Sequence, residues 1–416
     1  MTGFLSRRRF LGAAATSAAG LVGLRYFLPW WWRARPIVPL DELSDAARAL
    51  VADVTQGVDL RRVCDMHVHL VGYGTGDDGQ SWVSPDMESH WAPSRRLQFD
   101  VYKQAAGIRD VEFADEQYLT RLEALHAAGL GPLGARLMLL AFDFHVDESG
   151  GERRDRSTFH VANERVLSLA ANHPGYEAAV SIHPYRQDAV ERLERARRGG
   201  ARAVKWLPNA MGIDPASARC DAFFEALAAS GLVLISHAGL ERAVHAPEFQ
   251  EFGNPLRLRR ALEAGVTVIV AHSGSLGRSL DLDRGTGEDG RESFELFLRM
   301  MAEPRFEGQL FGGLSATAFV NRDPSVLQQL LGARSLHERL VYASDYPLPA
   351  VDPLISTWQL AARDFLDEAD RDPLEELFRA NPLVFHFALL RRVRLVEGQR
   401  TLRFAPGAFE SARLFA

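Results

Sequence analysis

The chain has 416 residues, 47% of them hydrophobic, and a formal net charge of −6 at neutral pH. This length can bury one large β/α domain or two smaller ones. The weakly acidic charge leaves no electrostatic footprint of a nucleic-acid-binding protein. Cys64 and Cys220 are the only cysteines, and because they form no CxxC pair, a cysteine-based zinc site is excluded.

The N-terminal segment, residues 1–35, carries the pattern of an export signal. Residues 6–11, Ser-Arg-Arg-Arg-Phe-Leu, precede an apolar run rich in Ala and Gly. Paired arginines before such a run resemble a twin-arginine signal, so we predict export by the twin-arginine machinery to the periplasm. Residues 10–32 are also long enough to cross a bilayer, so a retained anchor on the outer face of the cytoplasmic membrane is the alternative.

Strand-like and helix-like segments alternate over residues 63–390, after a lead-in at 36–62 that holds a helix at 40–54. The first strand, 63–70, is followed by a polar, Gly-rich insertion at 72–96. Short apolar runs predict further strands at 137–142, 178–182, 201–207, 232–236, 266–271, 309–314 and 340–344. Helices are predicted at 116–128, 159–172, 187–198, 218–229, 255–264, 291–302, 324–333 and 353–378.

Eight β/α units of this size predict a TIM (β/α)8 barrel. Each strand is a nearly continuous apolar run, as expected for a parallel sheet that is covered on both faces. A doubly wound sheet is the alternative, but it would not gather the ends of strands one, five, six and eight at one point. The last segment, 391–416, is predicted to form a small hairpin outside the barrel, turning at residues 397–398.

Four predicted strands carry a potential metal ligand at or near their carboxyl ends. Side chains alternate along a strand, so His67 and His69 point to the same side of the first one. The predicted ligands are His67, His69, His237 and Asp345. Three imidazoles and one carboxylate suit one divalent ion such as Zn²⁺, with a position left for water. Asp345 would also take a proton from that activated water, and His272 would bind the substrate's oxygen or protonate a leaving group.

These motifs resemble the amidohydrolase superfamily, in its amidohydrolase-2 branch of metal-dependent hydrolases and aminocarboxymuconate-semialdehyde-type decarboxylases. The resemblance covers about residues 60–390 and rests on seven stretches: Asp65-x-His67-x-His69, Ser181-Ile-His183-Pro184, Ala203-Val-Lys205-Trp-Leu-Pro208, Ile235-Ser-His237-Ala-Gly239, Val270-Ala-His272-Ser-Gly274, Ala343-Ser-Asp345-Tyr-Pro347 and Asn381-Pro-Leu-Val-Phe385. It implies the same barrel and the same roles for the ligands, Asp345 and His272, and it specifies no substrate.

Lys205 leaves two site models open. In the superfamily a Lys at the end of strand four can be carbamylated and bridge two metals, and His272 would then bind the second ion. The amidohydrolase-2 branch usually keeps one metal and an unmodified Lys, so a mononuclear site is favoured. A structural ion pair at the barrel mouth is the third interpretation of Lys205.

Residues in the predicted loops suggest substrate contacts at Arg242, Arg278, Trp206 and Tyr346. Arg242 and Arg278 can clamp a carboxylate, although surface arginines are equally expected in a chain whose only lysines are Lys103 and Lys205. The predicted function is hydrolysis of an amide, ester or lactone bond of a small molecule. Non-oxidative decarboxylation on the same scaffold is the alternative, and a non-enzymatic binding protein is disfavoured by the complete ligand set.

Overall fold

The computed structural model describes residues 35–75, 79–244, 246, 248–284, 290–352 and 354–415. The predicted export or anchor segment, except residue 35, lies outside these ranges. Among the helices in the described ranges, none combines the length and the apolar character that crossing a bilayer requires.

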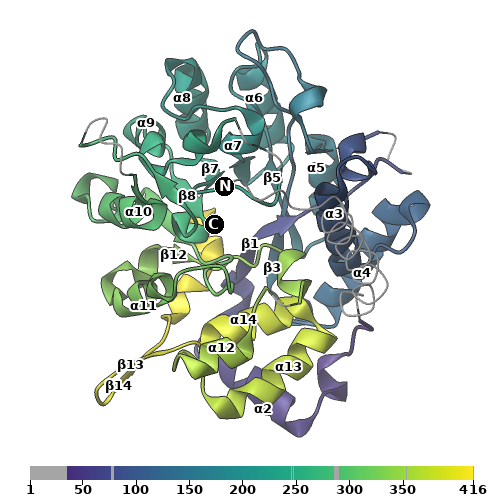
Figure 1. Cartoon of the computed structure of the whole chain (residues 1–416), viewed down its shortest axis with the longest axis vertical. Coiled ribbons are helices and arrows are strands. Elements are labelled where there is room, and N and C mark those ends of the chain that lie inside the picture. The colour runs from purple at the N-terminus through teal and green to yellow at the C-terminus, as the bar shows by residue number, and fades with distance from the viewer. Residues whose placement is uncertain are drawn as a thin grey trace, which may run out of the picture.

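Eight parallel strands form one sheet at the centre of the molecule, each paired with the next one along the barrel (Figure 1). They are β1 (Cys64–His69), β3 (Arg136–Leu140), β5 (Tyr176–Val180), β6 (Ala203–Trp206), β7 (Val233–His237), β8 (Val268–Ala271), β11 (Leu310–Gly313) and β12 (Leu340–Val341). The Met66 amide donates to the carbonyl of Tyr342 at 3.1 Å, and the Asp345 amide donates to the carbonyl of His67 at 2.9 Å. These bonds join the last strand segment to the first, which confirms the predicted TIM barrel.

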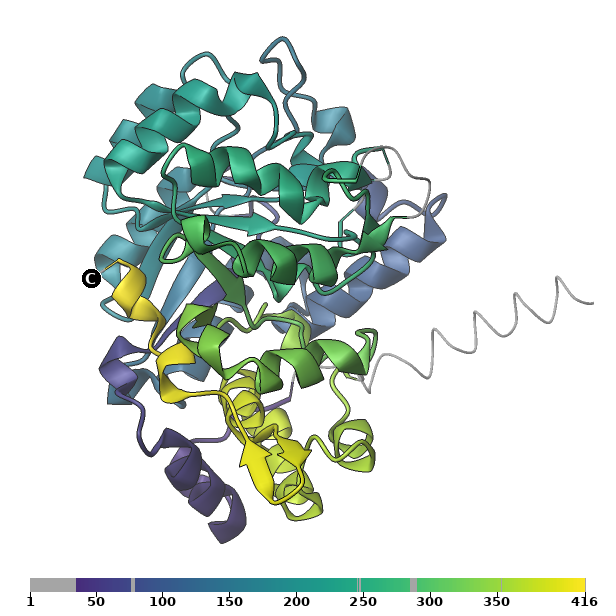
Figure 2. The ribbon, with the colours of Figure 1, turned by 90° about the vertical axis from the view of Figure 1, so that its left-hand side faces the viewer.

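Helices surround the sheet, as in the two perpendicular views of Figures 1 and 2. In chain order they are α2 (Asp45–Thr55), α3 (Pro93–Ala106), α4 (Ala114–Ala127), α5 (Asn163–Asn172), α6 (Ala189–Arg198), α7 (Pro208–Met211), α8 (Asp221–Ser230), α9 (Arg259–Glu263), α10 (Ser293–Met301), α11 (Pro324–Gly332), α12 (Thr357–Ala362), α13 (Arg371–Ala380) and α14 (Pro382–Arg392). Most follow a barrel strand, so the predicted alternation of strands and helices is confirmed.

Three connections differ from the sequence prediction. The predicted helix at 159–172 begins instead with a strand, β4 (Phe159–Val161), which pairs antiparallel with β2 (Ser81–Val83) inside the predicted insertion. The end of that insertion is the start of helix α3, which was not predicted. The predicted helix at 353–378 is split into α12 and α13, because Asp364 adopts a left-handed backbone with φ of 59° that an α-helix cannot continue through.

Side chains alternate between the barrel interior and the helical shell. The interior core contains Cys64, Met66, Met138, Leu140, Ala179, Ala203, Val233, Ile235, Ile269, Ala271, Phe311, Val341 and Ala343. The predicted hairpin is present as β13 (Leu395–Glu397) and β14 (Arg400–Leu402). The chain beyond the hairpin does not stay outside, because Ala412 packs into this interior core and Phe415 packs against it. The end of the barrel that Ala412 and Phe415 close is therefore filled by apolar side chains.

Candidate active site

Strand alternation places three titratable side chains at the carboxyl end of the barrel. Lys205 follows the interior residue Ala203 by two positions on β6, and His237 follows Ile235 by two positions on β7. Asp345 follows Ala343 in the same way after β12. A period of two residues therefore aims all three into the barrel, above the apolar core.

On β1 the alternation is interrupted by an irregularity. The pairing of β1 with β3 shifts register between Asp65 and Val68. Met66 belongs to the interior core, yet the next residue, His67, lies in the pocket together with His69. A bulge adds one residue to a strand and re-aims the side chains that follow it. Here it brings both histidines to the interior, a detail that the sequence pattern did not reveal.

The carboxylate of Asp65 fixes this bulge against the end of β12. Its Oδ1 accepts the amide of Ser344 at 2.7 Å and the amide of His67 at 3.2 Å. Ser344 directly precedes Asp345, and His67 is the first histidine of β1. One buried carboxylate therefore holds the two halves of the predicted metal site together.

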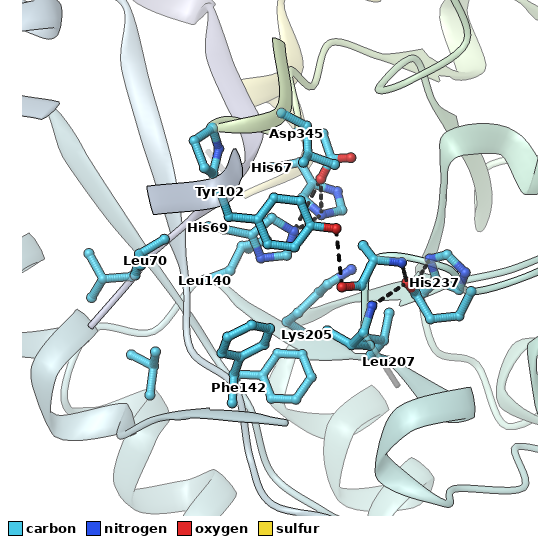
Figure 3. A pocket seen from close by; sticks show the side chains of 18 of the residues that line it. His67, His69, Leu70, Tyr102, Leu140, Phe142, Lys205, Leu207, His237 and Asp345 are labelled. Atoms are coloured by element: carbon cyan, nitrogen blue, oxygen red, sulfur yellow. Dashed lines mark hydrogen bonds and ion pairs between the residues drawn. The ribbon is translucent and has the colours of Figure 1, made fainter. Parts of the chain in front are cut away.

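The functional atoms of β1 and Asp345 converge closely. Nε2 of His67 lies 3.1 Å from Nε2 of His69, and both nitrogens face Oδ1 of Asp345, at 3.3 Å and 3.1 Å respectively. On the other side of the carboxylate, Oδ2 lies 3.9 Å from Nδ1 of His272. Figure 3 shows His67, His69 and Asp345 together at one end of the pocket.

His272 and Asp345 hold unusual backbone conformations. Their φ angles are 57° and 69°, in the left-handed region that residues other than glycine rarely adopt. Such a conformation costs about 1–3 kcal/mol and persists only where the surroundings enforce it, most often at functional sites. The hydroxyl of Ser315 also holds the His272 ring, with 2.9 Å between Oγ and Nδ1.

Burial favours the neutral form of three pocket imidazoles, those of His67, His237 and His272. Desolvation, assisted by the positive charge of Lys205, lowers the pKa of His67 and of His237 well below its usual value, and desolvation does the same for His272. Neutral imidazole is the form that binds a metal ion. Burial also lowers the pKa of Lys205 to about 8, partly offset by Asp345 and Glu241.

Glu241 is a site residue that the sequence reasoning missed. It is buried in the loop after β7, and its Oε2 lies 3.5 Å from Nδ1 of His237. Its Oε1 accepts the amides of Ala243 and Val244, the second at 3.0 Å. Desolvation raises the pKa of this carboxyl to about 7. A Glu four residues beyond a predicted ligand was the available signal.

The arrangement fits a divalent metal ion. His67, His272 and Asp345 each offer a ligand atom, all within 4.8 Å of one another. The separations of 3.1–3.3 Å among His67, His69 and Asp345 also match the ligand spacing of about 3.3 Å that tetrahedral bonds of about 2.0–2.1 Å produce. Neither ring nitrogen of His237, nor Nζ of Lys205, has a hydrogen-bond partner among the described residues. Buried polar atoms without partners are costly, and an ion would satisfy one ring nitrogen of His237.

The metal-ligand group lies at one end of a deeper pocket. Its cavity volume is about 130 Å³, and the cavity continues into an open mouth. The other walls are formed by Phe99 and Tyr102 of α3, by β4 and by the loop that holds Glu241. Figure 3 shows Leu70 and Phe142 on the side opposite His237. His183, in contrast, is buried outside the pocket, 2.9 Å from the carbonyl of Met211.

The four predicted substrate-contact residues lie outside this pocket. Trp206 and Tyr346 each follow an inward-facing residue by one position, so their side chains face the helical shell. In the shell, Trp206 packs on Phe223 and donates its indole N–H to the carbonyl of Ile182 at 2.9 Å. Arg242 is exposed, and Arg278 is exposed and paired with Glu292 at 3.2 Å. None of the four residues predicted to contact substrate is therefore among the described residues that line the pocket.

The family model described as amidohydrolase, of the amidohydrolase-2 type, matches residues 64–385. The chain therefore belongs to this family of metal-dependent enzymes, as the motifs around His67, His237 and Asp345 predicted. No curated protein matches the chain.

Several solved structures are similar to this chain. An uncharacterized TIM-barrel protein from Bordetella bronchiseptica is 15% identical, with a TM-score of 0.44 over 78% of this chain and 99% of that one. A protein named as a 2-pyrone-4,6-dicarboxylic acid hydrolase from Pseudomonas putida is 16% identical, with a TM-score of 0.43 over 78% of this chain and 97% of that one. The 5-carboxyvanillate decarboxylase of Sphingomonas paucimobilis is 12% identical, with a TM-score of 0.44 over 85% and 98%.

Proposed function

We propose that this protein is a hydrolase that cleaves an amide, ester or lactone bond of a small molecule with the help of one divalent metal ion, most simply Zn²⁺. The observation that carries the proposal is the convergence of His67, His69 and Asp345 within 3.3 Å of one another at one end of an open pocket. The buried neutral imidazoles support a nitrogen-rich site, which zinc prefers to magnesium or calcium.

His67, His69, His237 and Asp345 would hold the ion. When bound, the metal lowers the pKa of a water ligand to about 7. The carboxylate of Asp345 is placed for two tasks, because Oδ1 faces the β1 histidines while Oδ2 faces His272. One oxygen can therefore contact the ion while the other accepts the proton of the attacking water.

His272 is placed to act on the substrate. Ser315 fixes its ring at the rim of the metal-ligand group, 3.9 Å from the carboxylate that collects the proton. A neutral imidazole at this position donates a hydrogen bond to the substrate's oxygen and passes a proton to the leaving group. The near approach to Asp345 gives the proton a short route between the two steps.

Glu241 serves as a positioning residue in this proposal. Its carboxyl group lies 3.5 Å from His237 and is itself held by two backbone amides, so it fixes the orientation of the imidazole. Carboxylate groups that orient metal-bound histidines are common in metalloenzymes.

The test of the proposed reaction measures products. Purified protein with bound metal is incubated with a panel of esters, amides, lactones and aromatic carboxylic acids, and acid release is compared with carbon dioxide release. Acid release that requires metal and is lost in Asp345→Asn supports a hydrolase. Carbon dioxide as the only product would replace this proposal with a decarboxylase.

We also propose that the chain is exported by the twin-arginine machinery and acts in the periplasm or anchored to the outer face of the cytoplasmic membrane. The support is the sequence of residues 6–32 alone. Arg7→Lys with Arg8→Lys should retain folded protein in the cytoplasm, as measured by cell fractionation. Unchanged delivery to the periplasm would contradict the proposal.

A further inference from the structure

Away from the metal-ligand group, the wall of the pocket is built from apolar side chains. They come from β1, β3, β4, α3 and the loops after β6, β7 and β12. The members are Leu70, Val71, Phe99, Leu140, Phe142, Phe159, Val161, Leu207, Val244, Pro347 and Leu348. The aromatic part is contiguous, because the rings of Phe99 and Phe159 lie 5.8 Å apart. A substrate that reaches the metal end must lie against this apolar wall.

The polar groups of the wall are largely engaged with the protein. The hydroxyl of Tyr102 donates to the carbonyl of Ala243 at 3.2 Å and accepts the amide of Gln98 at 2.7 Å. Glu241 is bound by backbone amides and faces His237. His160 differs, because its buried Nδ1 has no hydrogen-bond partner among the described residues. Away from the metal end, the polar groups of the described wall are therefore mostly committed to the protein itself.

The lack of positively charged side chains among the described residues of the apolar wall limits the charge that a ligand can carry there. All but two of the chain's 48 basic residues are arginine, yet no arginine is found among the described residues that line the pocket. Lys205 is the only Lys or Arg among the described lining residues, and its charge acts on His67 and His237 at the metal end. Arg242 and Arg278 are exposed, and Arg322 hydrogen-bonds Ser275 and Asn321 outside the lining. A carboxylate on the distal part of a substrate would be buried without a partner, which is strongly unfavourable.

We infer that the substrate is neutral away from its scissile bond and carries an aromatic or branched apolar group on that side. This inference rests on the proposed function, because the hydrolysed bond is assumed to lie at the metal-ligand group. It adds that Phe99, Phe142 and Phe159 select the substrate by burying its apolar group, and that substrates with a second carboxylate are excluded.

Hydroxamic acids test this inference without knowledge of the substrate, because their head group chelates divalent metals. The probes are acetohydroxamic, benzohydroxamic and 4-carboxybenzohydroxamic acid, titrated into metal-loaded protein by calorimetry. Burying a phenyl ring in place of a methyl group should tighten binding about 10–100-fold. The added carboxylate should remove that gain or more.

A pair of variants connects the effect to the wall. Phe159→Ala should reduce the benzohydroxamic preference about 5–50-fold while leaving metal content and acetohydroxamic binding unchanged, since Phe159 is half-buried and lies on β4, which carries none of the predicted metal ligands. Arg242→Ala changes an exposed residue of the loop after β7 that does not line the pocket. This variant is the control and should leave all three affinities unchanged.

The outcomes separate this inference from the proposed function. Equal binding of the acetyl and benzoyl probes, tighter binding of the carboxylated probe, or a Phe159→Ala variant that keeps the full preference would overturn the apolar substrate class. Protein that holds no metal and binds no hydroxamate would contradict the proposed function itself, and the inference with it.

Discussion

The two ends of the pocket differ in where their side chains come from. The metal end is built by the barrel itself, with His67 and His69 on β1, Lys205 on β6 and His237 on β7. The apolar wall comes mainly from connections, above all α3 and β4. A closed sheet fixes atoms to within tenths of an ångström, whereas connecting segments vary readily in length and composition. The difference assigns chemistry to the strands and substrate selection to the connections.

Removing the proton acceptor should have the largest effect on turnover. Asp345→Asn keeps an oxygen near the β1 histidines but cannot take the proton of water. We expect most of the metal to remain and kcat to fall on the order of 10²–10⁴-fold. Metal analysis and steady-state kinetics measure the two quantities, and a variant with normal turnover would remove Asp345 from the reaction.

His272→Asn decides between the two models of the metal end. With one metal, the variant should keep its metal and lose turnover about as strongly as a general acid–base substitution does, on the order of 10²–10⁴-fold. If it instead loses a second metal equivalent, and mass spectrometry shows carbon dioxide added to Lys205, the site is binuclear. The lysine's buried Nζ, without a hydrogen-bond partner among the described residues, is compatible with either outcome.

Glu241→Gln should have an intermediate effect, because it acts through His237. Loss of an orienting carboxylate typically costs 10–100-fold in metal affinity or activity, and we expect that range for metal affinity measured by competition with a chelator. Glu225→Gln, on an exposed position of α8, is the matched control. Equal metal affinity in both variants would reduce Glu241 to a loop residue.

A smaller effect is predicted on the stability of the fold at acidic pH, at a histidine that does not line the pocket. His386 of α14 lies far from the pocket in the chain's outer layer, and burial lowers its pKa to about 3. In the unfolded state the His386 imidazole has a pKa of about 6.5, so between about pH 3 and pH 6.5 the unfolded state binds more protons than the folded state. The contribution of the neutral imidazole to stability is therefore complete above about pH 6.5 and is lost as the pH falls. His386→Leu should remove up to about 1.4 kcal/mol per pH unit of that loss, measured by urea unfolding at pH 7 and pH 5. An unchanged pH slope would contradict the neutral buried imidazole.

Much of the metal end could be predicted from sequence because strand geometry is nearly invariant. Period-two alternation and the meeting of strand ends in a barrel were enough to gather His237 and Asp345, whereas His67 reaches the pocket through a bulge. The same rule applied strictly would have excluded Trp206 and Tyr346, each one position beyond an inward-facing residue. The bulge after Asp65 could not be predicted, because it depends on the register with β3.

The wall of the pocket was largely invisible to the sequence pattern. Helix α3 and the β2–β4 pair lie in a segment whose polar composition suggested only an insertion, and β4 was absorbed into a predicted helix. These elements are defined by contacts with distant segments, such as Gln98 of α3 with the carbonyl of Arg242 at 2.8 Å. Such long-range pairing leaves no local period to recognise.

The metal content of the purified protein tests the central claim most directly. The account predicts close to one divalent ion per chain in the wild type, by elemental mass spectrometry, and loss of both metal and activity in the double variant His67→Ala with His69→Ala. Circular dichroism of the double variant serves as the folding control. Full metal occupancy in a folded double variant, or an active wild type that holds no metal, would contradict the account.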